Sequence, residues 1–459
     1  MFREKIDTVT KENLRNSDND GKAYTIMSGM AENNFPAFAV FCGMSTQQVG
    51  ILMSLPHFIG NIIQVVTTLL LAGSEKRKNW IVFGAVMQGI ALLPLAVGVL
   101  FLKTISFKFI LFSMILFLSA GLYIAPLWNA MMGDVVPDDI RGRYFGSRNS
   151  MLGMFTFCFI ALSGIILYFS KRFNYEHIGF AMLFVTGFIG RMFSSVYLTR
   201  MTDPCRHIEA PGFDFMKLFL DRDNRNYLNF VLFFSLIHLS VFVAGPYFAV
   251  YMLKELHFNY IEFTMASMTI IIAQFLTMSS WGKLSDKFGN REIIKFTGLW
   301  IIIAPLLWLI SGNLWYVVFI QIFAGVAWAG FSLSCGNYIF DSLDTAKRAV
   351  GFSALQFMIG VAIFLGASIG GIIVNHIETH GIIFLKSLFG GYNIRPLFLI
   401  SGIARLFVFV IFLKRFEEMR VKVESGPLNL VFIISRIRPI LGLGFDLISS
   451  YFKNNKKNQ

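Results

Sequence analysis

Long apolar stretches alternate with short polar segments along most of the chain. A helix needs about 17–25 apolar residues to cross the hydrocarbon core of a bilayer. Because lipid offers the backbone no hydrogen-bond partners, each such stretch must be helical. The pattern predicts an all-α integral membrane protein with twelve transmembrane helices. The predicted spans are 23–43, 49–72, 80–102, 109–132, 149–170, 178–198, 227–253, 261–281, 293–311, 315–340, 350–374 and 394–413.

The two halves of the chain repeat one another. Residues 36–40 read Pro-Ala-Phe-Ala-Val, and residues 246–250, 210 positions later, read Pro-Tyr-Phe-Ala-Val. Gln64 and Gln274 are related by the same offset. Duplicated membrane proteins often bind their substrate between the two copies, which rock against each other. The repeat therefore predicts two six-helix pseudo-repeats and favours a transporter.

The apolar pattern divides the chain into five segments. The two six-helix bundles cover 23–198 and 227–413, and 199–226 joins them as a cytoplasmic linker with a short amphipathic helix. Polar residues dominate 1–22, which we expect to be a cytoplasmic N-terminal tail. The basic C-terminal tail, 414–459, is expected in the cytoplasm or at the membrane interface.

Charged residues are sparse and unevenly distributed. They make up 15% of the chain, against about 25% in soluble domains. The net charge of +13 comes mainly from Lys and Arg in the tails and in alternate loops, which places both termini in the cytoplasm. The opposite loops hold few basic residues, namely Lys103, Lys108, Lys171, Arg172, Lys254, Lys386 and Arg395. We therefore expect a multi-pass protein of the cell membrane, inner or plasma, without a nucleic-acid partner. We also expect no signal peptide.

The sequence contains no strong catalytic or metal-binding signature. Its cysteines are scattered without metal-ligand spacing, at Cys42, Cys158, Cys205 and Cys335. No Gly-Lys-Ser or Gly-Lys-Thr ends a phosphate loop, which argues against direct use of ATP. His376 and His380 do not form the zinc-protease pattern, although their spacing would suit a metal if the segment were helical. We expect no enzyme activity, no cofactor and no metal.

Glu32 lies in the middle of the first predicted span. A charged residue at the centre of a membrane helix costs about 2.5–3.5 kcal/mol on insertion scales, so it must face a cavity or a partner. Its counterpart in the second repeat is Phe242, so the carboxyl group is not a product of the repeat. We interpret Glu32 as a proton carrier or as the counter-ion of a cationic substrate. The alternative is a structural carboxyl group that ties neighbouring helices together.

A polar stripe runs along the second span. His57, Asn61 and Gln64 recur at i, i+4 and i+7, and Gln274 is the repeat partner of Gln64. This spacing predicts residues that line a central cavity, unless they form hydrogen bonds between packed helices. Further candidates for the cavity lie near the middle of the first, seventh and tenth spans, namely Asn33, His238 and Trp328.

Arg191 and Arg405 occupy equivalent places in the sixth and twelfth spans. Each is seven or eight residues from the cytoplasmic end of its span, which is roughly 10–12 Å at 1.5 Å per residue. A long side chain can reach the interface over much of that distance. We therefore expect both guanidinium groups to extend to the cytoplasmic interface in a shared structural role.

Two cytoplasmic segments carry a more specific pattern. Residues 282–291 read Gly-Lys-Leu-Ser-Asp-Lys-Phe-Gly-Asn-Arg, whose glycines permit a tight turn and a close helix approach. This segment resembles the signature loop of the major facilitator superfamily, which follows the second span and recurs after the eighth. The second-span copy keeps the pair Glu75-Lys76 but lacks the frame of two glycines around it. Residues 133–149 are similar to the loop between the fourth and fifth spans of bacterial members.

The resemblance covers about residues 10–415 and implies two six-helix halves around a central site. It also implies a cytoplasmic gate in which Asp134 pairs with Arg141 or Arg148, and Asp341 with Arg348. Exposed ion pairs contribute only about 0–1 kcal/mol each, which suits a gate that must open. The other gate residues come from the signature loops, namely Glu75, Gly282, Asp286, Lys287, Gly289 and Arg291.

Together these features predict a secondary active transporter that moves a small organic solute by alternating access, coupled to protons. We expect it to act as a monomer among membrane lipids. An uncoupled facilitator, or a membrane sensor that binds a ligand without moving it, are the alternatives. The solute stays open, because mid-span Asn, Gln and Trp suit a sugar or polyol, whereas Glu32 among many Phe residues suits an apolar cation.

Overall fold

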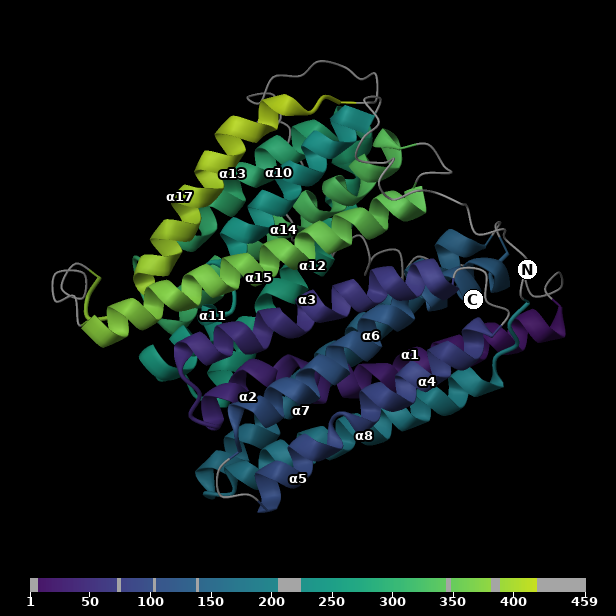
Figure 1. The fold of residues 1–459 in the computed structure, drawn as a ribbon, viewed down its shortest axis with the longest axis horizontal. Coiled ribbons are helices and arrows are strands. Elements are labelled where there is room, and N and C mark those ends of the chain that lie inside the picture. The colour runs from purple at the N-terminus through teal and green to yellow at the C-terminus, as the bar shows by residue number, and fades with distance from the viewer. Residues whose placement is uncertain are drawn as a thin grey trace, which may run out of the picture.

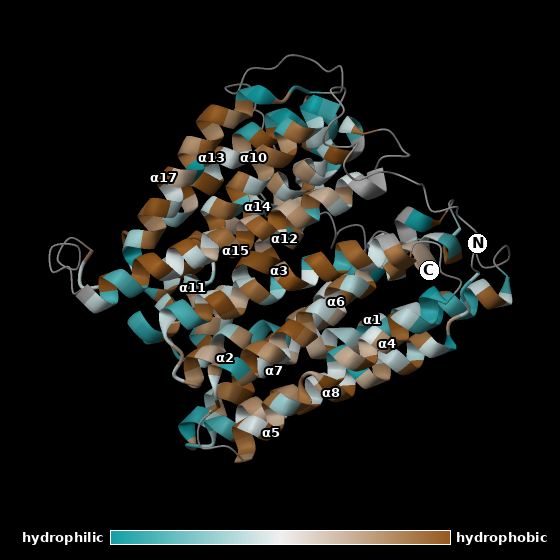
Figure 2. Cartoon of the chain, viewed as in Figure 1, coloured by the Kyte–Doolittle hydropathy of each residue, from teal (hydrophilic) through white to brown (hydrophobic). Residues whose placement is uncertain are grey.

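The computed structural model describes residues 7–71, 76–101, 105–137, 140–204, 224–343, 348–380 and 389–418. Within these ranges the regular secondary structure is entirely helical. Ten helical segments of this part of the chain are long and apolar enough to cross a membrane. The all-α membrane fold predicted from the hydropathy pattern is therefore confirmed. Figure 1 shows the two halves side by side, and apolar residues dominate the middle of most helices in Figure 2.

The N-terminal half is built from consecutive membrane-crossing helices. Its elements are α1 (Thr8–Met30), η1 (Glu32–Asn34), α2 (Phe35–Phe41), α3 (Thr46–Leu71), α4 (Arg77–Ile90), α5 (Leu93–Phe101), α6 (Phe107–Val135), α7 (Arg141–Arg172) and α8 (Glu176–Arg200).

The C-terminal half follows the same plan. Its elements are α10 (Arg225–Phe242), α11 (Tyr247–Val250), η3 (Tyr251–Glu255), α12 (Tyr260–Phe288), α13 (Asn290–Leu307), α14 (Leu314–Ser342), α15 (Arg348–His380) and α17 (Arg395–Phe412).

The first predicted span corresponds to α1 with α2, and the ninth corresponds to α13. These two spans are more polar than the other ten. α13 carries Arg291, Glu292 and Lys295 near its start, and it packs against α14 and α17. α1 packs against α7 and α8. Both helices thus belong to the bundle, and the order of elements agrees with twelve predicted spans.

Residues 8–22 form a helix rather than the predicted polar tail. Asp7 caps this helix, because its Oδ1 accepts a hydrogen bond of 2.9 Å from the Thr10 backbone N–H. Four polar side chains of this segment are buried, namely Asn13, Asn16, Ser17 and Asp20. A hydropathy pattern does not show that such a helix belongs to the bundle, because its polar side chains are paired inside the protein and do not face lipid. The amphipathic helix predicted in the linker, and the C-terminal tail beyond residue 418, lie outside the described residues.

Both repeats interrupt their first helix at a proline. α1 ends at Met30, a short 3-10 turn follows, and Pro36 occupies the first turn of α2. Proline has no N–H to continue the helical ladder, but it fits the start of a new helix. The Asn34 side chain donates 2.8 Å to the Met30 carbonyl that the break leaves free. Pro246 precedes α11 at the equivalent place, so the structure reproduces the sequence repeat.

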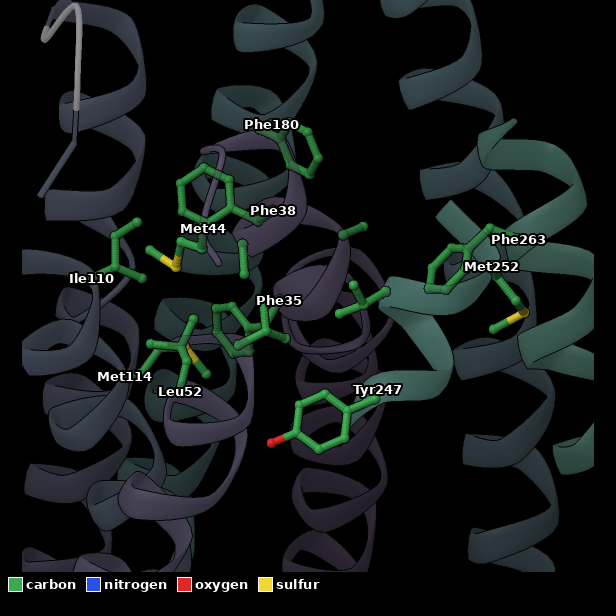
Figure 3. Packing of buried hydrophobic residues seen from close by; sticks show 14 of the residues in the cluster. Phe35, Phe38, Met44, Leu52, Ile110, Met114, Phe180, Tyr247, Met252 and Phe263 are labelled. Carbon is green, nitrogen blue, oxygen red and sulfur yellow. The ribbon is translucent and has the colours of Figure 1, made fainter. Parts of the chain in front are cut away.

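The two halves pack along α3 with α15 and along α7 with α12. A hydrophobic cluster with members from both halves fills the space between α2, α11 and their neighbours. Figure 3 shows Phe35 and Phe38 of the first half in this cluster with Tyr247, Met252 and Phe263 of the second. We call the end of the bundle where α8 finishes and α10 begins the linker end. The contact between the halves lies at the opposite end.

Candidate functional site

A cavity of about 400 Å³ lies inside the N-terminal half. This volume falls in the range of small-molecule sites, which is about 300–1,000 Å³. Helices α1, α3, α4, α6, α7 and α8 and the turn η1 contribute its walls. The charged and polar side chains that line it are Asp20, Tyr24, Glu32, His57, Gln88, Trp128, Asn129, Arg148 and Arg191.

Glu32 reaches this cavity because it occupies the first position of the turn that interrupts the first helix. Its side chain is partly exposed to the cavity. Its Oε2 is nevertheless buried and has no hydrogen-bond partner within the described structure. The carboxyl group therefore keeps one oxygen available.

Asp20 is the shared anion of two buried arginines. Ser194 accepts a hydrogen bond of 2.6 Å from Arg191 Nη1 and donates one of 2.6 Å to Asp20 Oδ1. Arg148 Nη2 lies 3.7 Å from Asp20 Oδ2, and Arg148 also donates to the Ser17 carbonyl. These contacts connect α1, α7 and α8 around one side of the cavity.

Each of these arginines lies over an aromatic ring of the cavity wall. The guanidinium carbon of Arg148 is 4.5 Å from the centre of the Trp128 ring. That of Arg191 is 5.1 Å from the centre of the Tyr24 ring. Such contacts favour a cation over an aromatic face, more strongly away from water. They hold both cations against the wall and leave the middle of the cavity open.

Sequence reasoning found only part of this site. Of the predicted cavity residues, Glu32 and His57 line it. Asn61 packs instead against Gly360 of α15, between the halves. Gln64 Oε1 is buried without a hydrogen-bond partner in the described chain, and Asn33 is partly exposed next to Glu32.

The predicted residues of the C-terminal half do not line this cavity. His238 Nδ1 is 2.9 Å from the Phe234 carbonyl, and its ring meets Trp328 edge to face. Gln274 packs near Gly325 of α14 through its backbone. The structure therefore supports packing roles for His238 and Trp328 in this conformation.

The expectation that Arg191 and Arg405 extend to the interface was wrong. Arg191 is 4% exposed and Arg405 is 3% exposed. Arg405 donates 2.8 Å to the Ile301 carbonyl and 3.2 Å to Ser401 Oγ. Both guanidinium groups find partners inside the bundle, so neither needs to reach water.

Asp20, Tyr24, Gln88, Trp128 and Arg191 were not among the predicted site residues. A signal for part of this set is present in the sequence. Polar residues recur every fourth position from residue 20 to Glu32, at 20, 24, 28 and 32, which makes one stripe on a helix. The stripe is visible only if the helix is taken to begin before residue 20.

The predicted gate residues pair within their own halves in this structure. Asp134 accepts from Arg77 at 2.5 Å, and Arg77 also pairs with Asp203 at 2.6 Å. Asp134 therefore pairs with neither predicted partner, since Arg141 donates to the Gly133 carbonyl and Arg148 faces Asp20.

The second signature loop is likewise held inside the C-terminal half. Asn290 donates 2.7 Å to Asp341, and the backbone N–H of Arg291 donates 2.7 Å to Glu418. Gly289 ends α12 with φ +92°, which only glycine adopts readily. The other predicted members are Gly282, which packs near Leu333, and the exposed Asp286 and Lys287. Glu75 and the side chain of Arg348 lie outside the described residues.

Polar contacts between the two halves occur at the end opposite the linker. Lys254 Nζ donates 2.6 Å to the Met44 carbonyl, and Thr46 Oγ1 donates 2.8 Å to Glu378. Tyr260 donates to Glu176, and Lys171 lies 5.4 Å from the centre of the Tyr260 ring. These contacts close that end of the bundle over the hydrophobic cluster.

Comparison with known proteins adds a sequence match and a fold match. Residues 230–454 match the sequence profile of the Major Facilitator Superfamily. The chain is 29% identical over 117 residues to the class H tetracycline resistance protein of Pasteurella multocida, covering 26% of this chain and 28% of that one. It is 26% identical over 132 residues to the class B protein of Escherichia coli, covering 29% and 31%. The chain thus spans about a third of the length of the curated relatives it matches.

Solved structures share the fold over nearly their whole length. A mutant form of the nucleoside transporter NupG superimposes with a TM-score of 0.70 at 13% identity, covering 88% of this chain and all of that one. A D-xylose-proton symporter gives 0.65 at 14% identity, covering 90% and 99%. A bacterial homologue of the lysosomal transporter Spinster, in an inward-facing conformation, gives 0.61 at 14% identity, covering 90% and 99%. At these identities the likeness shows the fold alone.

Proposed function

Because this chain belongs to the major facilitator superfamily, we propose that it is a secondary transporter that moves a small organic solute across a membrane by alternating access, coupled to protons through Glu32. Its relatives and structural neighbours are transporters, which supports movement of a solute across a membrane. The solute and the coupling ion are parts of this proposal.

The observation that carries the proposal is the cavity around Glu32. It is large enough for a small organic molecule, it lies inside a membrane bundle, and it contains charged groups without a full set of partners. Ionisable residues inside a membrane are expensive, and they usually mark a substrate or proton pathway. The interrupted first helix adds backbone polar groups at the same depth, which is typical of transporter sites.

The conformation supports alternating access. The halves are tied together at the end opposite the linker by Lys254 with Met44 and by Thr46 with Glu378. Arg77 and Asn290, at the linker end, pair within their own halves. We take this conformation as inward-facing, with the linker and both termini in the cytoplasm and the closed end outside. Ion pairs across the linker end would then form only in the outward-facing state.

Glu32 suits proton coupling because its carboxyl group belongs to the cavity lining, and one of its oxygens has no partner among the described residues. Binding a proton at Glu32 changes the charge that a solute meets in the cavity, so the two events are linked. Moving one charge through 100 mV provides about 2.3 kcal/mol, which corresponds to roughly fifty-fold accumulation.

The test is transport by the purified protein in proteoliposomes. Wild-type protein should concentrate its solute when a pH gradient is imposed, and it should catalyse counterflow without one. Glu32→Gln should lose accumulation but keep counterflow. The matched control is Glu292→Gln, because Glu292 forms a partly exposed pair with Lys295 on α13, away from the cavity.

Each alternative gives a different result in the same assay. An uncoupled facilitator shows counterflow but no accumulation in the wild type. A sensor binds the solute and shows no counterflow at all. If Glu32→Gln concentrates the solute as the wild type does, Glu32 is not the coupling residue.

A further inference from the structure

Four buried polar atoms that belong to residues lining the cavity have no hydrogen-bond partner among the described residues. Two of them are acceptors, Glu32 Oε2 and Gln88 Oε1, and two are donors, Arg191 Nε and Trp128 Nε1. Buried polar atoms in folded proteins almost always have a partner. Four exceptions around one cavity of ligand size indicate that a ligand supplies the missing partners.

The other charged groups of the cavity are already engaged. Asp20 accepts from Ser194 and faces Arg148. Arg148 also donates to the Ser17 carbonyl and lies over Trp128. Arg191 uses Nη1 for Ser194, which leaves Nε for a ligand. The buried atoms left without a partner thus belong to one anion, one cation, one neutral acceptor and one neutral donor.

We propose, building on the transport function above, that this cavity selects small zwitterions. An ammonium group donates to Glu32 and Gln88, and a carboxylate accepts from Arg191 and Trp128. The lining carries two acidic and two basic side chains, so its formal charge is balanced. A solute with one charge would supply a partner for only one of Glu32 and Arg191 and leave the other without one. A zwitterion supplies both partners at once, which is discrimination by unsatisfied charge.

The aromatic residues argue against a site for quaternary ammonium ions. Such sites place several aromatic faces around the cation. Here the Tyr24 and Trp128 faces already hold Arg191 and Arg148. A ligand ammonium group therefore relies on oxygen acceptors, which require N–H donors.

The experiment measures binding of matched solutes to the purified full chain by calorimetry and thermal unfolding. Each series keeps one side chain, that of alanine, leucine or phenylalanine, and varies only the charges. The free amino acid is the zwitterion, its amide is the cation, its N-acetyl form is the anion, and its N-acetyl amide is neutral. In at least one series the zwitterion should bind at least tenfold more tightly than each of the other three forms.

Variants assign the two ends of the solute. Glu32→Gln should abolish the advantage of the zwitterion over the anion, because the ammonium group loses its counter-ion. Arg191→Gln should abolish its advantage over the cation. If Arg191→Gln does not fold, Trp128→Phe removes the indole N–H, keeps a smaller aromatic face for Arg148 and should weaken binding of the carboxylate end. The matched control is Arg405→Gln, which removes an equally buried arginine outside the cavity and should keep the preference.

Three outcomes overturn the inference: a cation, anion or neutral form that binds as tightly as the zwitterion, a preference that survives both Glu32→Gln and Arg191→Gln, or no binding in any series. Counterflow of the same solutes separates this inference from the proposed function. A zwitterion that binds selectively but shows no counterflow supports the inference and contradicts transport. Counterflow of only singly charged or neutral solutes supports transport and contradicts the inference.

Discussion

Lys254 and Met44 touch although they lie 210 positions apart, through a hydrogen bond of 2.6 Å from the Lys254 ammonium group to the Met44 carbonyl. The same offset relates Pro36 to Pro246. Residues that are equivalent in the two repeats therefore meet at the end opposite the linker. Equivalent positions can touch only near the axis that relates the repeats, so this contact marks where the two halves close on each other.

Lys254→Met should weaken this closure. The variant loses one hydrogen bond from a charged donor, which contributes about 1.5–3 kcal/mol when it is shielded from water. Lys254 is only partly buried, so we expect roughly a tenfold shift toward the conformation open at this end. Double electron–electron resonance between spin labels at the exposed residues Ser45 and Thr379 measures the population of each distance.

Lys11→Met is the control for this measurement, because Lys11 is exposed in the first turns of α1. It should leave the distance distribution unchanged. An unchanged distribution in Lys254→Met would mean that the hydrophobic cluster alone holds this end shut.

Gly50→Ala should open the same end by a steric route. A methyl group on Gly50 of α3 would lie 2.0 Å from the Tyr247 hydroxyl oxygen of the other half. Tyr247 has little freedom to move, because its hydroxyl donates 2.6 Å to the Ala367 carbonyl. The halves must separate locally, so we expect a longer distance between the same labels and a clear loss of transport.

The matched control for Gly50→Ala is Gly153→Ala in α7, where an added methyl group meets nothing within 4 Å. This variant should transport at the wild-type rate. Equal behaviour of the two variants would show that the close approach of Gly50 and Tyr247 is not needed for closure.

Hydropathy and the repeat predicted the membrane fold, because span length and duplication are properties of the chain alone. The site was harder to predict, because its residues come together through packing. Glu32 stood out as a charge in an apolar span, whereas Asp20 lay in a segment too polar to be taken as part of the bundle. Its burial depends on Arg148 and Ser194, which come from α7 and α8.

The ion pairs show the same limit. The resemblance implied that Asp134 pairs with Arg141 or Arg148, both later in the chain. The observed partner is Arg77, 57 residues earlier, because α4 packs against α6. Nearby sequence positions suggest candidate pairs, but helix packing decides which of them form.

Asp20→Asn should destabilise the N-terminal half. Asp20 is the anion that Arg148 faces directly and that Arg191 reaches through Ser194. Removing one member of a buried charge network leaves the others unpaired, at a cost of about 3–5 kcal/mol. We expect a clear fall in the thermal unfolding temperature of the detergent-purified protein.

Asp7→Asn is the control for Asp20→Asn. Asp7 caps the start of α1 by accepting from the Thr10 N–H. Asparagine caps helices about as well as aspartate, so this variant should unfold like the wild type. If Asp20→Asn is as stable as Asp7→Asn, the two arginines do not depend on Asp20.

The affinity for a zwitterion should fall as the pH falls, because a protonated Glu32 cannot pair with an ammonium group. The solute and the proton then compete for the same carboxyl group. Thermodynamic linkage therefore limits the fall in affinity for the zwitterion to about tenfold per pH unit. Arg148, Arg191, Asp20, Tyr24 and His57 face the same cavity, and histidine is the residue type among them whose unperturbed pKa is nearest to neutral pH. Calorimetric titration of the wild type from about pH 5 to 8, the range in which histidine also titrates, measures the slope. Glu32→Gln should remove most of it, whereas His57→Asn should keep it. The opposite pattern, with the slope retained in Glu32→Gln and lost in His57→Asn, would assign the proton to the histidine.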